Sequence, residues 1–142
     1  MMMKNWLTQQ GVYLAWTLAL VSMLTSLYFS EIAGYPPCLL CWYQRVFMYP
    51  LVFIIGVGII RRDHAIALYV LPLSIVGTAI ALYHNLLSWH VISESLAPCQ
   101  AGVSCVNNVV LGYGFITIPL LSLFAFTCIT LLMIVYQKTS HA

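Results

Sequence analysis

Apolar residues fill four long stretches of this chain, and the few charged residues stand between them. The stretches cover residues 11–30, 42–60, 65–87 and 115–136. Each is 19 to 23 residues long, and about 20 residues of α-helix cross the ~30 Å hydrocarbon core of a bilayer. The pattern therefore predicts four membrane-crossing helices, with longer connections at residues 31–41 and 88–114.

The composition supports a chain whose main solvent is lipid. Of its 142 residues, 63% are hydrophobic and only 6% are charged, whereas a soluble domain carries about 25% charged residues. Prolines at positions 50, 72 and 119 interrupt the apolar stretches, which membrane helices tolerate. We expect an all-α membrane protein, with residues 1–142 forming a single four-helix bundle. The net charge of +2 gives no indication of a nucleic acid partner.

The basic residues that flank the predicted helices predict the orientation of the bundle. They precede the first helix, separate the second from the third, and follow the fourth: Lys4, Arg61, Arg62 and Lys138. The connections at residues 31–41 and 88–114 contain no lysine or arginine. Because cytoplasmic segments are enriched in these residues, both termini are expected in the cytoplasm and both longer loops outside.

Four cysteines fall in or beside the two predicted outer loops: Cys38, Cys41, Cys99 and Cys105. Disulfides persist outside the cytosol, so this placement permits disulfide chemistry. The fifth cysteine, Cys128, lies near the middle of the last apolar stretch. A small apolar side chain packed between helices is its simplest interpretation.

The first cysteine pair is a Cys-x-x-Cys motif at the predicted start of the second helix. Cys38 and Cys41 follow two prolines, and they would close a very small ring. Such a ring suits a bond that is made and broken repeatedly. Cys41 would lie in the first helical turn, where free N–H groups and the helix dipole favour a thiolate, the nucleophilic form of cysteine.

Arg45 follows Cys41 by four residues, so helical spacing places both on one face. An ionisable residue inside a membrane segment is a candidate functional residue. The alternative is an arginine that reaches the outer interface and anchors the helix. Beside the cysteine pair, we favour a guanidinium that stabilises a thiolate and donates hydrogen bonds to a polarised carbonyl group.

The second cysteine pair lies in the last predicted loop. Five residues separate Cys99 from Cys105, and Gly102 lies between them, which indicates a flexible and accessible loop. A structural disulfide is the alternative, but two pairs on one face of a small bundle favour a relay. Just before this loop, apolar residues at helical spacing over 86–96 predict a short helix on the membrane surface.

The segment Cys38-Leu-Leu-Cys41-Trp-Tyr-Gln-Arg45 resembles the C-x-x-C-x-x-x-R signature of the disulfide-bond formation protein B (DsbB) family. Four helices, inward termini and a second outer pair extend the resemblance over nearly the whole chain. The close spacing of the second pair looks like the short BdbC-like branch known from Bacillus. The resemblance implies a multi-pass thiol-disulfide oxidoreductase of the bacterial cytoplasmic membrane, with its cysteine loops on the outer side.

The resemblance also implies partners and residue roles. Family members reoxidise an extracytoplasmic thioredoxin-fold thiol oxidase of the DsbA or BdbD type and pass the electrons to a membrane quinone, ubiquinone or menaquinone. This supports disulfide formation in exported proteins. By resemblance, the redox-active disulfides are Cys99–Cys105 and Cys38–Cys41. Cys99 would join the partner, Cys105 would resolve that bond and communicate with Cys38, and Cys41 and Arg45 would contact the quinone.

His84 is the one histidine considered for function. It falls near the outer end of the third predicted helix, at the depth of Cys41 and Arg45. It is a candidate proton donor or hydrogen-bond partner of a quinone, and family members often have a histidine near this position. A histidine satisfied by a neighbouring helix is an equally good interpretation.

Three other functions are alternatives to the relay. A vitamin K epoxide reductase-like enzyme has the same chemistry, but its loop pair precedes the Cys-x-x-Cys motif, whereas here it follows. A zinc or copper protein would use four thiolates, although 57 residues separate Cys41 from Cys99. A purely structural four-span adaptor would have cysteines that never change redox state. The relay requires no metal.

Overall fold

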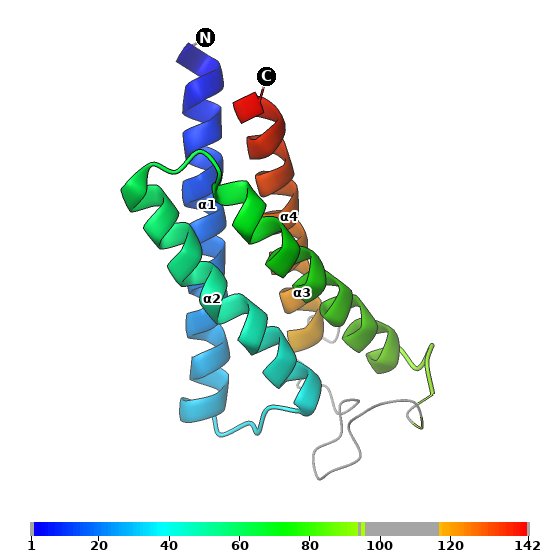
Figure 1. Cartoon of the computed structure of the whole chain (residues 1–142). Coiled ribbons are helices and arrows are strands. Elements are labelled where there is room, and N and C mark those ends of the chain that lie inside the picture. Colours follow the sequence, from blue (N-terminus) through cyan, green and yellow to red (C-terminus); the bar gives the residue numbers. More distant parts are fainter. Residues whose placement is uncertain (1, 94, 96–116, 142) are drawn as a thin grey trace.

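The computed structural model describes residues 2–93, 95 and 117–141. It contains four long α-helices: α1 (Met2–Leu27), α2 (Leu39–Arg61), α3 (Ile66–Ser88) and α4 (Ile118–His141). All four are long and apolar enough to cross a membrane, which confirms the predicted all-α fold. The two termini and the α2–α3 connection lie at one end of the bundle, and α2 begins at the other end (Figure 1).

Several helices extend beyond the apolar stretches that predict them. α1 begins at Met2, ahead of the apolar stretch that starts at residue 11, and α4 continues to His141, past residue 136. The apolar stretch marks the part of a helix that suits hydrocarbon. Helical hydrogen bonding continues beyond it through residues such as Gln and Lys, which have good helix propensity.

The segment after α3 differs from its sequence prediction. α3 runs through Leu87, which is fully buried, and ends at Ser88. The Trp89 and Val91 N–H groups then bond back to carbonyls of the last helical turn, and His90 adopts a left-handed φ of 55°. A single surface helix over 86–96 is therefore wrong, because its first residues belong to the packed end of α3.

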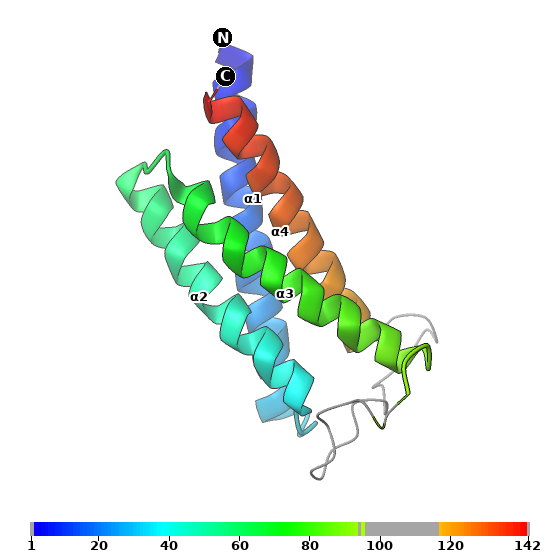
Figure 2. The same ribbon diagram turned by 45° about the vertical axis from the view of Figure 1, so that its right-hand side comes forward.

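Each helix packs against two neighbours in the order α1, α2, α3, α4 and back to α1 (Figures 1 and 2). Small residues allow close approach: Ala15, Ala19 and Ala81 are fully buried, and a Cβ at Gly77 would collide with the Phe126 ring. Membrane helices commonly pack through small residues in this way.

Side-chain hydrogen bonds also link neighbouring helices. The Trp16 indole on α1 donates to the Val52 carbonyl on α2 at 3.1 Å. On α3, the Asn85 amide donates to the Pro119 carbonyl in the first turn of α4 at 2.8 Å. Asn85 directly follows His84, so this bond fixes that turn of α3 against α4.

The end of α1 changes its helical geometry. A π-helical turn, η1 (Tyr28–Ile32), follows Leu27 directly, and the Ala33 N–H bonds to the Tyr28 carbonyl five residues back. Such turns are rare and occur frequently at functional sites. The chain then crosses to the start of α2, where the two prolines lead into Cys38.

Candidate functional site

Cys38 is the N-cap residue of α2, and Cys41 lies in its first turn. The Cys38 sulfur accepts the Cys41 backbone N–H at 3.4 Å, so it satisfies one of the N–H groups that a helix start leaves free. The two sulfurs share a hydrogen bond at 3.0 Å, and both residues are free thiols. Cys38 is 6% exposed. The two sulfurs are therefore close enough to form a disulfide after a small movement.

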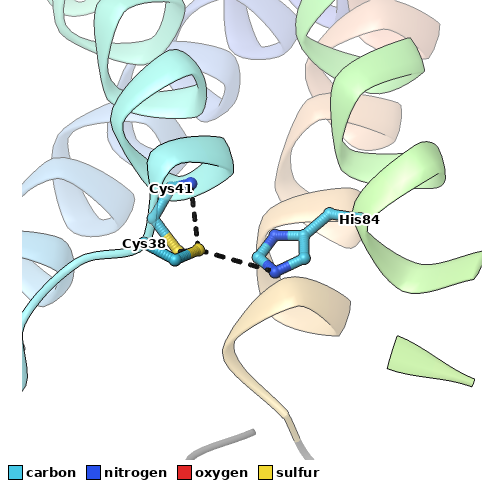
Figure 3. Close-up of side chains that lie close together, drawn as sticks. All are labelled: Cys38, Cys41 and His84. Atoms are coloured by element: carbon cyan, nitrogen blue, oxygen red, sulfur yellow. Dashed lines mark hydrogen bonds between the residues drawn. The ribbon is translucent and has the colours of Figure 1, made fainter. Parts of the chain in front are cut away.

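His84 reaches this pair from the neighbouring helix α3. Its Nε2 lies 3.8 Å from the Cys38 sulfur (Figure 3), and its Nδ1 lies 3.1 Å from the side-chain nitrogen of Gln44 on α2. The histidine is 2% exposed and Gln44 is 6% exposed. His84 thus connects the cysteine pair to a second buried polar group.

Gln44 was not among the residues that sequence reasoning selected. A signal was present, because a glutamine three residues after Cys41 in an apolar segment needs a polar partner. Its partner could not be identified from the sequence, since the contact to His84 spans 40 residues. Only the packing of α2 on α3 brings them together.

The surroundings of Cys38 favour its ionised form. Its thiol pKa is lowered from 9.0 to about 4. The largest cause is the hydrogen bond shared with the Cys41 thiol, and the His84 ring lowers the pKa further, while burial acts in the opposite direction. In the reduced pair, Cys38 is therefore the sulfur that carries negative charge near neutral pH.

Arg45 is fixed by the end of α1. Its Nε donates to the Ser26 hydroxyl at 2.8 Å, and its Nη2 donates to the Ser26 carbonyl at 2.9 Å. Its guanidinium carbon lies 5.7 Å from the centre of the Trp42 ring, within cation–π range. In the described part of the chain, Arg45 forms no pair with a carboxylate. Its positive charge stays available one turn below Cys41.

One cavity of about 290 Å³ joins these groups. All four helices contribute to its wall, together with η1 and the segment that precedes α2. Its polar residues include Cys38, Cys41, Gln44, Arg45 and His84. The remainder is largely apolar, with residues such as Leu18, Val21, Met48, Phe124 and Phe126. Such a cavity suits an apolar molecule that carries a hydrogen-bond acceptor.

The structure brings four of the six predicted site residues together: Cys38, Cys41, Arg45 and His84 all line this cavity. Cys99 and Cys105 lie outside the described residues, so their roles remain predictions. Cys128 is a free thiol on α4. The Cys38 and Cys41 sulfurs and a His84 ring nitrogen lie within 4.8 Å of one another, a set of soft donors that is relevant to the metal-binding alternative.

Comparisons with known proteins identify the family of the chain. The family described as "Disulfide bond formation protein DsbB" matches residues 8–136. Disulfide bond formation protein C of Bacillus subtilis (strain 168) is 45% identical over 122 residues, covering 86% of this chain and 88% of that relative. A probable disulfide formation protein of Metapseudomonas resinovorans is 38% identical over 133 residues, covering 93% and 92%. No solved structure matches the chain.

Proposed function

The chain belongs to the DsbB family of disulfide bond formation proteins, and on that premise we propose that it reoxidises an extracytoplasmic thioredoxin-fold thiol oxidase and passes the electrons to a membrane quinone. It is a multi-pass membrane disulfide oxidoreductase that supports disulfide bond formation. The observation that carries the proposal is that the Cys38–Cys41 pair, with its sulfurs 3.0 Å apart, and the Arg45 guanidinium line one largely apolar cavity.

An acceptor other than a protein disulfide is required by the energetics. A DsbA-type partner has a reduction potential of about −120 mV, whereas structural disulfides lie below about −300 mV. Since about 30 mV corresponds to about 1.4 kcal/mol for a two-electron couple, an ordinary disulfide could not accept these electrons. A bound quinone supplies the missing oxidising power by taking up two electrons and two protons.

The cavity residues fit a quinone. The apolar side chains of α1 and α4 suit an isoprenoid tail and a flat ring, and the guanidinium of Arg45 can donate to a carbonyl oxygen. Cys41 would face the quinone, and Arg45 would hold it. The printed contacts of the His84 ring go to Cys38 and Gln44. They favour a role for His84 on the cysteine pair over direct quinone contact.

In each exchange of the proposed relay, one disulfide bond forms as another breaks. The partner dithiol reduces Cys99–Cys105 and becomes a disulfide. The thiolate of Cys105 then attacks Cys38, the Cys38–Cys41 bond breaks, and Cys41 leaves as a thiolate. Attack of Cys99 on Cys105 restores that disulfide and releases Cys38 as a thiolate. The Cys38–Cys41 pair now holds two electrons, which leave with two protons when its disulfide reforms.

The arrangement of the bundle supports the proposed location in a bacterial cytoplasmic membrane. Both termini and the connection that carries Arg62 lie at one end, and the start of α2 lies at the other (Figure 1). With the basic end in the cytoplasm, Cys38 and Cys41 open toward the outer side. An extracytoplasmic partner would then meet the cysteines without crossing the membrane.

Trapping the partner tests the first half of the relay. A Cys105→Ala variant should retain the partner on Cys99 as a mixed disulfide, because the resolving thiol is gone. We expect a thioredoxin-fold protein in the trapped complex, and none with a Cys99→Ala, Cys105→Ala double variant. Recovery of no thioredoxin-fold protein would contradict the proposal. Stoichiometric zinc or copper with redox-inert cysteines would support the metal-binding alternative instead.

A further inference from the structure

Gln44 and His84 form a buried polar pair between α2 and α3. Their side chains are 6% and 2% exposed, and the Gln44 nitrogen lies 3.1 Å from His84 Nδ1. A buried amide and a buried ring each lose free energy unless they are hydrogen-bonded. Their contact gives the Gln44 side-chain nitrogen and His84 Nδ1 a hydrogen-bond partner. The other ring nitrogen of His84 points at Cys38 (Figure 3).

This contact selects one tautomer of the histidine. An amide N–H that donates to Nδ1 requires a lone pair there, so the proton of the neutral ring sits on Nε2. Nε2 is the atom 3.8 Å from the Cys38 sulfur. A thiolate accepts hydrogen bonds and donates none, so an Nε2–H group is the complementary neighbour. The opposite tautomer would direct a lone pair at a negatively charged sulfur.

We propose that Gln44 is a positioning residue that holds His84 in the Nε2–H tautomer, so that His84 donates a hydrogen bond to the Cys38 thiolate each time that sulfur is released from a mixed disulfide. The inference rests on the proposed relay. In that step the Cys99–Cys105 bond forms, the Cys105–Cys38 bond breaks, and the electron pair leaves on Cys38. His84 donates a hydrogen bond without giving up its proton.

No other polar group of the described cavity takes this role. Its titratable or charged side chains are Tyr35, Cys38, Cys41, Arg45, Tyr49 and His84, and the described parts of α1 and α4 add none. Arg45 directs two of its nitrogens at Ser26. His84 is the only one of these groups that comes from α3, and Gln44 is the side chain at 3.1 Å from its other nitrogen.

Two substitutions separate this role from simple packing. Gln44→Leu keeps a similar volume but removes the donor to Nδ1. Gln44→Glu keeps a hydrogen bond but reverses it, because a carboxylate accepts from an Nδ1–H group. The neutral ring then carries its proton on Nδ1, so Nε2 has no hydrogen to donate to Cys38.

The ionisation of Cys38 is measured on the reduced protein alone, with Cys99, Cys105 and Cys128 replaced by alanine, by ultraviolet thiolate absorbance against pH. We expect Gln44→Leu to raise the midpoint by about one pH unit or more and to slow turnover with partner and quinone about tenfold. Gln44→Glu should also raise the midpoint, because the neutral His84 ring then has no Nε2–H group to donate to Cys38. Neither partner nor quinone enters the absorbance measurement, so its result stands if the relay itself fails.

A double-variant cycle gives the decisive comparison. If Gln44 acts through His84, Gln44→Leu should shift the Cys38 midpoint no further in a His84→Phe background. The inference is overturned if Gln44→Leu shifts it equally in both backgrounds, or leaves it unchanged in the parent. Thermal unfolding of each variant in detergent identifies loss of fold, and Gln44→Glu keeps the test informative if Gln44→Leu unfolds.

Discussion

Arg45 donates two hydrogen bonds to one residue, Ser26: Nε to its hydroxyl at 2.8 Å and Nη2 to its backbone carbonyl at 2.9 Å. This fork ties the second turn of α2 to the last turn of α1, directly before the π-helical turn η1 (Tyr28–Ile32). The guanidinium is thereby held at the cavity wall by neutral acceptors. A carboxylate in their place would have cancelled the charge that the proposed quinone site needs.

Removing the hydrogen bonds between Arg45 and Ser26 should slow quinone-dependent turnover, and two substitutions should do so to different extents. Ser26→Ala removes one of the two acceptors and is expected to reduce turnover about tenfold, the worth of one hydrogen bond to a charged group. Arg45→Lys should cost about 100-fold, because an ammonium cannot make the same two-pronged contact. Quinone-dependent turnover at varied quinone concentration measures both effects. Ser22→Ala, at another cavity serine, is the control, and equal effects of Ser22→Ala and Ser26→Ala would contradict the assignment.

The reduced Cys38 thiol should ionise at a pH far below the pKa of an ordinary cysteine. Because its pKa is lowered to about 4 by the hydrogen bond with Cys41 and by His84, the thiolate should persist above that pH and disappear as the pH falls through it. Ultraviolet thiolate absorbance of a variant that retains only Cys38 and Cys41 tests this. The rise in thiolate absorbance at about pH 4 should vanish in Cys38→Ser. A thiolate that appears only near pH 9.0, the ordinary cysteine value, would show that the two sulfurs do not interact as described.

The contact between α3 and α4 should not tolerate a methyl group at Gly77. The added Cβ would collide with the fully buried Phe126 ring, and overpacking of this kind costs about 1–3 kcal/mol. Gly77→Ala should therefore lower the unfolding temperature in detergent. Gly11→Ala is the matched control, because its Cβ meets no atom within 4 Å and alanine favours a helix. Equal stability of the two variants would contradict the close packing.

The orientation of the bundle is open to direct labelling. In a chain whose native cysteines are replaced, Ala33→Cys and His64→Cys each place a thiol at an exposed position, at opposite ends of α2. If the basic end faces the cytoplasm, a membrane-impermeant maleimide should label position 33 in intact cells and position 64 only after lysis. The reverse pattern would place the cysteine pair on the cytoplasmic side and remove the proposed partner's access.

What the sequence could predict depended on whether a contact is local. Four apolar stretches predicted the four helices, and helical spacing placed Arg45 beneath Cys41. The π turn after α1, the extension of α3 to Ser88 and the fork to Ser26 depend on how the helices pack, which periodicity does not specify. His84 was predicted near the outer end of the third helix, but its contact with Cys38 depends on the rotation of α3. Gln44 was missed because its role exists only through that histidine.

The central claim is that electrons leave through the Cys38–Cys41 pair to a membrane quinone. The most direct test is quinone reduction by the purified protein, supplied with a reduced thioredoxin-fold partner and followed by the ultraviolet absorbance of ubiquinone and of menaquinone in separate reactions. The account predicts steady turnover with at least one quinone, full activity in Cys128→Ser and none in Cys41→Ser. Turnover that survives Cys41→Ser, or a partner oxidised while both quinones stay oxidised, would contradict it.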